Sequence, residues 1–123
     1  MGVDYGGKRV GIALSDETGR FAYPYEVMKN GKTLAQRVSK VCEKERVGRV
    51  ILGRSLDYKM KPNVVMSRIE NFKNELEFVS GLEVIYEDEF LTTAEAERVL
   101  GRDGKTDAVA AAIILKSYID KHS

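Results

Sequence analysis

The sequence predicts an α/β fold in which a mixed β-sheet carries helices on both faces. Two observations lead to this prediction: three strand-like segments follow one another at the start of the chain, and helical and strand-like segments alternate after them. A meander of strands followed by alternating elements is typical of a mixed sheet between helices. The length of 123 residues is that of one domain, so we expect residues 1–123 to form a single domain.

The strand predictions depend on apolar alternation. In the second segment Val10, Ile12 and Leu14 share one face, which is the period of two expected of a strand. Pro24 in the third segment removes a backbone donor and therefore indicates an edge strand or an irregularity. We expect the first three strands over residues 1–5, 9–15 and 21–28.

Helical spacing appears after the third strand. Apolar residues fall on one face of two segments, namely Leu34, Val38, Val41 and Cys42, and then Val65, Ile69, Phe72, Leu76 and Val79. Thr92 and Glu95 form a capping box for a further helix that stops near Gly101. We expect helices from a Thr33 cap to residue 46, from residue 64 to Gly81, over 92–101, and from a Thr106 cap to residue 118, with strands at 49–53 and 82–86 and a polar loop at 54–63.

The near-neutral charge of the chain hides an uneven distribution. The net charge is +1, but residues 1–68 hold fourteen Lys and Arg against seven Asp and Glu, whereas residues 69–123 hold six against twelve. The halves are therefore +7 and −6. Such asymmetry fits a polyanion-binding surface beside an acidic site, and it equally fits two halves that neutralise each other in the fold.

Composition excludes several classes of protein. No apolar run has the roughly 18 residues of a membrane span, and no signal peptide is visible, so we expect a cytoplasmic protein with no membrane partner. Cys42 is the single cysteine and lies on an apolar helix face, which predicts core packing. His122 is the single histidine, so no Ser-His-Asp or Cys-His arrangement can be proposed.

Carboxylates occur where three predicted elements begin or end. Asp4 ends the first strand, Glu87, Asp88 and Glu89 follow the last strand, and Asp107 lies in the first turn of the last helix. Ligands of open α/β sheets bind beyond the carboxyl ends of the strands. Carboxylates gathered there would repel one another unless a hard cation such as Mg²⁺ or Mn²⁺ intervened. Two such ions can activate water and stabilise the leaving oxygen of a phosphodiester.

Each of these features also has a plain structural explanation. Asp107 can complement the helix dipole, and the acidic run after the last strand can be a solvated turn. The Gly6-Gly7 turn beside Lys8 and Arg9 suits a phosphate and equally an ordinary hairpin. The four alanines of the last helix offer a small surface, so we expect this helix to lie close to the sheet and to bring Asp107 near Asp4; they are Ala108, Ala110, Ala111 and Ala112.

Three segments together resemble the YqgF family, which is described as Holliday-junction-resolvase-like and as candidate pre-16S ribosomal RNA nucleases. They are Val3-Asp4-Tyr5-Gly6 with Lys8-Arg9-Val10-Gly11-Ile12-Ala13 and Ser15-Asp16, then Asp88-Glu89-Phe90-Leu91-Thr92-Thr93, and then residues 105–115 from Lys105-Thr106-Asp107 onward. The resemblance covers essentially the whole chain. Phe90 departs from the family, which usually has Arg there, and Gly53-Arg54-Ser55-Leu56 stands where Gly-Leu-Pro-Leu is usual.

The resemblance implies a ribonuclease H-like fold, a five-stranded mixed sheet with the first three strands antiparallel and helices on its flanks. It also implies a metal-dependent phosphodiesterase acting on structured nucleic acid in the cytoplasm. By position, Asp4, Glu89 and Asp107 match the catalytic and metal-binding carboxylates, and Asp88 matches a supporting Asp.

We therefore hypothesise hydrolysis of a nucleic-acid phosphodiester by two Mg²⁺ or Mn²⁺ ions held by Asp4, Glu89 and Asp107, in the processing of the 5′ end of pre-16S rRNA. A DNA junction resolvase, a binding module without catalysis and a phosphate-handling relative of actin-like ATPases remain alternatives. The chain could act as a monomer or a homodimer, and as an endonuclease or an exonuclease. We expect the backbone phosphates to be contacted by Lys8, Arg9, Arg54, Lys59, Lys61 and Arg68.

Overall fold

The computed structural model of the chain describes residues 1–55, 64–89 and 105–122. Its sheet has five strands in the order β3-β2-β1-β4-β5, with β3, β2 and β1 antiparallel and β4 and β5 added in parallel. This is the mixed sheet that the resemblance implies. The elements are β1 (Gly2–Tyr5), β2 (Arg9–Ser15), β3 (Ala22–Lys29), α1 (Leu34–Lys44), β4 (Arg49–Ser55), α2 (Val64–Ser80), β5 (Glu83–Glu89) and α4 (Lys105–Lys121).

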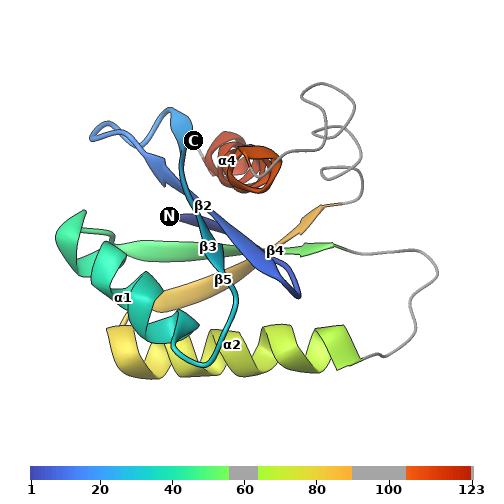
Figure 1. Cartoon of the computed structure of the whole chain (residues 1–123). Coiled ribbons are helices and arrows are strands. Elements are labelled where there is room, and N and C mark those ends of the chain that lie inside the picture. The colour runs from blue at the N-terminus through green and yellow to red at the C-terminus, as the bar shows by residue number, and fades with distance from the viewer. Residues whose placement is uncertain (56–63, 90–104, 123) are drawn as a thin grey trace.

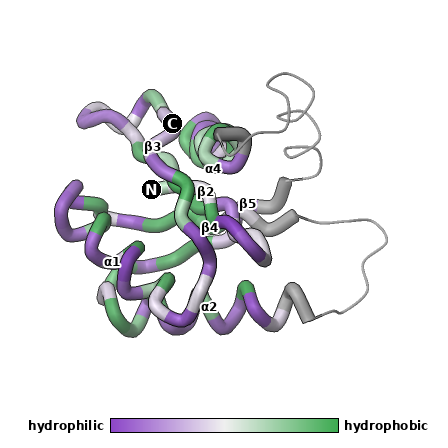
Figure 2. Tube along the Cα trace, viewed as in Figure 1, coloured by the Kyte–Doolittle hydropathy of each residue, from purple (hydrophilic) through white to green (hydrophobic). Residues whose placement is uncertain are grey.

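Helices cover both faces of the sheet. Figure 1 shows α4 on one face and the pair α1 and α2 on the other, with the carboxyl ends of β4 and β5 at the same side of the molecule. Hydrophobic residues lie along the strands between these layers, and the outer turns are hydrophilic (Figure 2). The carboxyl ends of β1, β4 and β5 therefore share one edge, where an open α/β sheet places its ligand.

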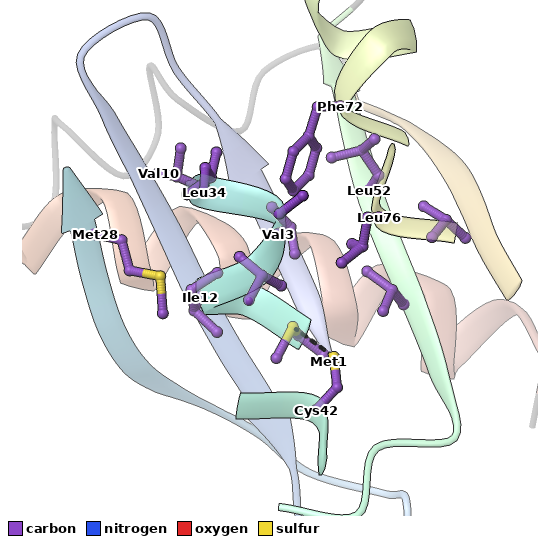
Figure 3. Packing of buried hydrophobic residues seen from close by; sticks show 14 of the residues in the cluster. Met1, Val3, Val10, Ile12, Met28, Leu34, Cys42, Leu52, Phe72 and Leu76 are labelled. Carbon is purple, nitrogen blue, oxygen red and sulfur yellow. Dashed lines mark hydrogen bonds between the residues drawn. The ribbon is translucent and has the colours of Figure 1, made fainter. Parts of the chain in front are cut away.

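The larger core lies between the sheet and the α1–α2 layer (Figure 3). Val3 and Ile12 of the sheet are fully buried, and the helices bury Leu34, Val38, Cys42, Phe72 and Leu76 against them. The expected core position of Cys42 is thus confirmed. One expected member of the α2 stripe is wrong, because Val79 is 37% exposed and does not belong to the core.

The third strand lies at the edge of the sheet, as Pro24 predicted. The register between β2 and β3 shifts after Ile12, which pairs with Glu26, whereas Ala13 pairs with Pro24. Tyr25 is therefore the extra residue of a bulge. A bulge beside proline is a local solution to the missing backbone donor.

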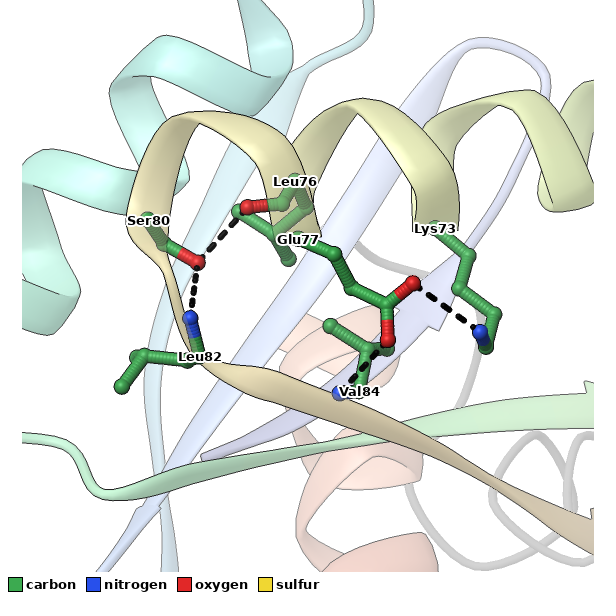
Figure 4. Close-up of polar contacts among 6 residues, drawn as sticks. All are labelled: Lys73, Leu76, Glu77, Ser80, Leu82 and Val84. Atoms are coloured by element: carbon green, nitrogen blue, oxygen red, sulfur yellow. Dashed lines mark hydrogen bonds and ion pairs between the residues drawn. The ribbon is translucent and has the colours of Figure 1, made fainter.

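Polar contacts at the end of α2 fix where β5 begins (Figure 4). Gly81 has φ +71°, and its N–H donates to the carbonyl of Glu77, which ends the helix. The Ser80 hydroxyl donates to the Leu76 carbonyl and accepts from the N–H of Leu82. The Glu77 carboxylate accepts from the N–H of Val84 and pairs with Lys73 at 3.1 Å. The first residues of β5 are thereby tied to the helix before them.

Several expected boundaries differ from the structure. The strands β4 and β5 continue to Ser55 and Glu89, beyond the expected ends at 53 and 86. Thr33 is the N-cap residue of α1, as expected, but its hydroxyl makes no cap bond to the helix backbone and instead accepts from Arg37 Nε. Thr106 lies inside α4, which already begins at Lys105, so it is not the cap. The helix expected at 92–101 lies outside the described residues.

Helix α4 packs against glycines of three neighbouring strands. A Cβ on Gly2 would lie 2.6 Å from the Ala111 carbonyl oxygen, and one on Gly11 would overlap the carbonyl group of Asp107. A Cβ on Gly53 would overlap the side chain of Ile114. The alanines of the helix are buried on their side of this contact, namely Ala108, Ala110, Ala111 and Ala112. The small residues on both sides let the helix backbone rest on the sheet, as the alanine pattern predicted.

We expect Gly11→Ala to destabilise the protein by about 1–3 kcal/mol, because the new methyl group must displace the first turn of α4. Urea unfolding checks this against Gly48→Ala, where the added Cβ meets nothing within 4 Å. Equal unfolding midpoints for the two variants would contradict the close seating of α4.

Candidate active site

Asp4 lies at the centre of the sheet and has a glycine on each side. Its register partners are Gly11 on β2 and Gly53 on β4. Because glycine carries no side chain, the backbone of Asp107 lies directly over Gly11 and the side chain of Ile114 fills the space over Gly53. Asp4 therefore lies between two glycines that α4 covers, beside the first turn of that helix.

Asp107 reaches the same place from the other layer. Its backbone lies directly over Gly11, the strand partner of Asp4. Asp107 is also a source of the electrostatic repulsion that Asp4 experiences. The structure therefore brings together two carboxylates that are separated by more than a hundred residues in the chain.

Burial, and in second place the neighbouring Asp107 carboxylate, together raise the pKa of Asp4 from 3.8 to about 7. Desolvation disfavours the charged form of a carboxyl group, and a like charge nearby adds to that effect. Asp4 is thus held near the balance between its neutral and charged forms at physiological pH. A titratable group perturbed in this way at a strand end is typical of a functional site.

Arg9 partly compensates the charge of Asp107. Its Nε lies 2.9 Å from Asp107 Oδ2, and the side chains are 58% and 26% exposed, respectively. The pair is close but not aligned as a hydrogen bond: Oδ2 is buried and accepts no hydrogen bond from any described residue. Arg9, which we expected to contact phosphates, therefore faces the acidic site itself.

This arrangement fits a hard divalent cation. Two adjacent carboxylates, one with a raised pKa and the other with a buried oxygen that lacks a hydrogen bond, offer the oxygen ligands that Mg²⁺ and Mn²⁺ prefer. Within residues 1–55, 64–89 and 105–122, no group of three metal-ligating side chains is assembled. Glu89 and Asp88 end β5 opposite Ser55 and Arg54, at the same edge of the sheet.

Glu87 has a different role from the acidic residues that follow it. It is 6% exposed, accepts a hydrogen bond from the Ser117 hydroxyl at 3.0 Å and pairs with Lys121 at 2.6 Å. Both partners belong to the last turns of α4, whereas Asp107 lies in the first turn. Glu87 therefore differs in role from Asp88 and Glu89, because it connects the last turns of α4 to β5.

The expected phosphate-binding cations are only partly described. Lys8 is exposed in the β1–β2 turn, and Arg68 is exposed on α2. Arg54 lies in β4 one residue after Gly53. Lys59 and Lys61 lie outside the described residues. The structure thus places two exposed cations, Lys8 and Arg68, on elements that flank the carboxyl end of β1.

Asn30 was missed by the sequence analysis. Its Nδ2 donates to the Gly6 carbonyl at 2.8 Å, and its backbone N–H donates to the Lys8 carbonyl at 2.9 Å. Both bonds hold the turn that follows Asp4. No local pattern could have revealed this, because the bonded residues are more than twenty positions apart.

A sizeable hollow of the structure lies away from the candidate active site. A hollow of about 930 Å³ lies at the opposite end of β1, among residues such as Met1, Glu45 and Tyr118. Its Arg49 is already engaged by Glu83 at 3.1 Å and by the Tyr118 hydroxyl at 2.8 Å. The chemistry of the carboxylates and their place at the strand ends therefore decide which region is the candidate site.

Known proteins of the same fold include Holliday junction resolvases. The chain aligns with Thermus thermophilus RuvC in complex with a Holliday junction substrate at a TM-score of 0.62 and 16% identity, covering 99% of this chain and 94% of that one. It aligns with fowlpox virus resolvase bound to Holliday junction DNA at a TM-score of 0.55 and 18% identity, covering 98% and 96%. These likenesses confirm the ribonuclease H-like fold.

Sequence comparison is more specific. The family model described as RuvX, Holliday junction resolvase, matches residues 1–121. A relative from Endomicrobium trichonymphae is 34% identical over 100% of this chain and 96% of its own length, and one from Desulforudis audaxviator is 35% identical over 98% and 92%. Both carry the name "Putative pre-16S rRNA nuclease". The chain belongs to the RuvX (YqgF) family, as the three segments indicated.

The raised pKa of Asp4 predicts a pH-dependent stability. The folded state holds this proton up to about pH 7, whereas the unfolded chain releases it near 3.8. The free energy of unfolding that Asp4 contributes therefore falls as pH rises between these values and is constant above them. We expect Asp4→Asn to gain stability relative to wild type across this interval, by about 4 kcal/mol in all.

Urea unfolding of both proteins in EDTA, from pH 4 to 8, measures this difference. A constant gap between the two stability curves would contradict the raised pKa of Asp4.

Proposed function

We propose that this chain is a nuclease that uses divalent cations to hydrolyse phosphodiester bonds in structured nucleic acid. The observation that carries the proposal is the pairing of Asp4 with Asp107 at the carboxyl edge of the sheet, with Asp4 held near its protonation midpoint at neutral pH. Two neighbouring carboxylates repel each other when both are charged, and a bound divalent cation would relieve this repulsion.

Asp4 and Asp107 would hold Mg²⁺ or Mn²⁺ together with Glu89, and Asp88 would support them. Asp4 and Glu87 are both register partners of Gly53, on either side of it in the sheet. Position 89 lies two residues after Glu87 in β5, the spacing at which a strand returns to the same face. Two bound ions would supply an activated water and stabilise the leaving oxygen of the phosphodiester.

The cations around the site would bind the substrate. Lys8 lies in the turn that follows Asp4, and Arg9 lies at the far end of that turn against Asp107. A cation bound to Asp107 would compete with Arg9 for the carboxylate and leave the guanidinium available to a phosphate. Arg54, Lys59, Lys61 and Arg68 complete the proposed phosphate contacts, which makes binding dependent on salt.

We propose the 5′ end of pre-16S rRNA as the substrate, which places the reaction in the cytoplasm. The names of the full-length relatives support this assignment. A four-way DNA junction is the second candidate, because the matching family model is described as a Holliday junction resolvase. No helix among the described residues could span a membrane.

We expect Asp4→Asn to abolish cleavage, with a loss of at least about 100-fold, because the amide cannot supply the negative charge that the cation requires. The assay follows a pre-16S rRNA leader and a four-way DNA junction in Mg²⁺ or Mn²⁺. Asp120→Asn is the matched control, since it removes an exposed carboxylate of the same helix as Asp107.

Three outcomes distinguish the candidates. Cleavage of the RNA by wild type and Asp120→Asn supports the proposal, and cleavage of the DNA junction alone supports the second candidate. Binding without cleavage, unaffected by EDTA and by Asp4→Asn, would instead identify a binding module.

We also expect Mn²⁺ to raise the melting temperature of wild type, because a ligand that binds only the folded state stabilises it. Asp4→Asn and Asp107→Asn should each lose this shift, and Asp120→Asn should keep it. A Mn²⁺-induced shift of the same size in all four proteins would place the cation elsewhere.

A further inference from the structure

We propose that the hollow between the β3–α1 loop and α2 is a phosphate subsite for the nucleic-acid strand beside the cleaved bond. The proposal rests on the proposed function for the identity of its ligand. It assigns Lys32, Asn71 and Arg68 as the residues that hold a phosphate there, on the opposite face of β1 from the carboxylates.

The hollow has a volume of about 160 Å³ and is lined by Tyr5, Asn30, Lys32, Arg68, Asn71 and Phe72, among others. Pockets that enclose a whole small molecule are typically about 300–1,000 Å³. The hollow is therefore suited to one group of a longer ligand, with the remainder outside. A strand of nucleic acid offers such a group in every phosphate.

The polar lining of the hollow carries two cations, Lys32 and Arg68. Lys32, Arg68 and Asn71 are exposed, and their side chains make no hydrogen bond or ion pair within the described part of the chain. Glu75 is the carboxylate of the lining, and its Oε1 accepts from Gln36 Nε2 at 3.4 Å. Two cations and an amide donor against one engaged carboxylate favour an anionic ligand.

The hollow is rigidly connected to the candidate active site. Tyr5 follows Asp4 directly in β1, and its ring packs against Phe72 with 5.2 Å between the ring centroids. Asn30, also in the lining, clamps the turn from Gly6 to Lys8 by the two hydrogen bonds described above. A strand that passes over this turn could therefore contact Asp4 on one side and the hollow on the other.

The test measures binding of the intact protein to a labelled RNA stem-loop carrying the 5′ leader of 16S rRNA, in EDTA to prevent cleavage. We expect Lys32→Gln and Arg68→Gln each to weaken binding several-fold. Each should also lower the slope of log affinity against log salt by about 0.7–0.9, the value of one phosphate contact. Lys40→Gln, an exposed lysine of α1 outside the hollow, is the control and should change neither quantity.

Neutral methylphosphonate groups, placed one at a time along the RNA, then locate the phosphate. One position should weaken binding by wild type but have little further effect on Lys32→Gln, because both changes remove the same contact. The proposal is overturned if Lys32→Gln and Arg68→Gln bind like wild type, or if the neutral groups weaken all proteins equally.

These outcomes separate the subsite from the catalytic proposal. Unchanged binding by both variants, together with normal cleavage by wild type, removes the subsite and leaves the nuclease. Weakened binding by both variants, without cleavage by wild type in Mg²⁺ or Mn²⁺, leaves the subsite and removes the nuclease.

Discussion

The close seating of α4 on the sheet is the constraint on which the candidate site depends. The sheet has no side chain to hold the helix away at three positions, namely Gly2, Gly11 and Gly53. The buried alanines of α4 keep the helix side of this contact equally small. At the other end, Lys121 and Ser117 fasten the helix to Glu87. The site carboxylates are thus placed by packing between backbones, which tolerates little change in side-chain volume.

This seating has an electrostatic consequence. It forces Asp107 against the strand position of Asp4, where burial already disfavours charge. Arg9 relieves part of the repulsion but leaves one carboxylate oxygen of Asp107 without a hydrogen bond from the described residues. The fold therefore maintains an unfavourable cluster of oxygens, which a divalent cation would stabilise.

The sequence predicted the parts of the fold that depend on local pattern. Alternation in residues 9–15 and the helical stripe containing Leu34 and Cys42 gave correct elements, and the alanines predicted the close helix. The nonlocal contacts were not predictable from patterns: the Asn30 clamp and the pairing of Glu87 with Lys121 join distant segments. Thr106 was wrong as a cap, because α4 already begins at Lys105 and a capping bond contributes only about 1 kcal/mol.

Anomalous diffraction from a crystal of this protein soaked in Mn²⁺ tests the central claim most directly. The account predicts a manganese peak within coordination distance of both Asp4 and Asp107, with Arg9 displaced from Asp107. Manganese that binds elsewhere, with the ion pair between Arg9 and Asp107 retained, would contradict it.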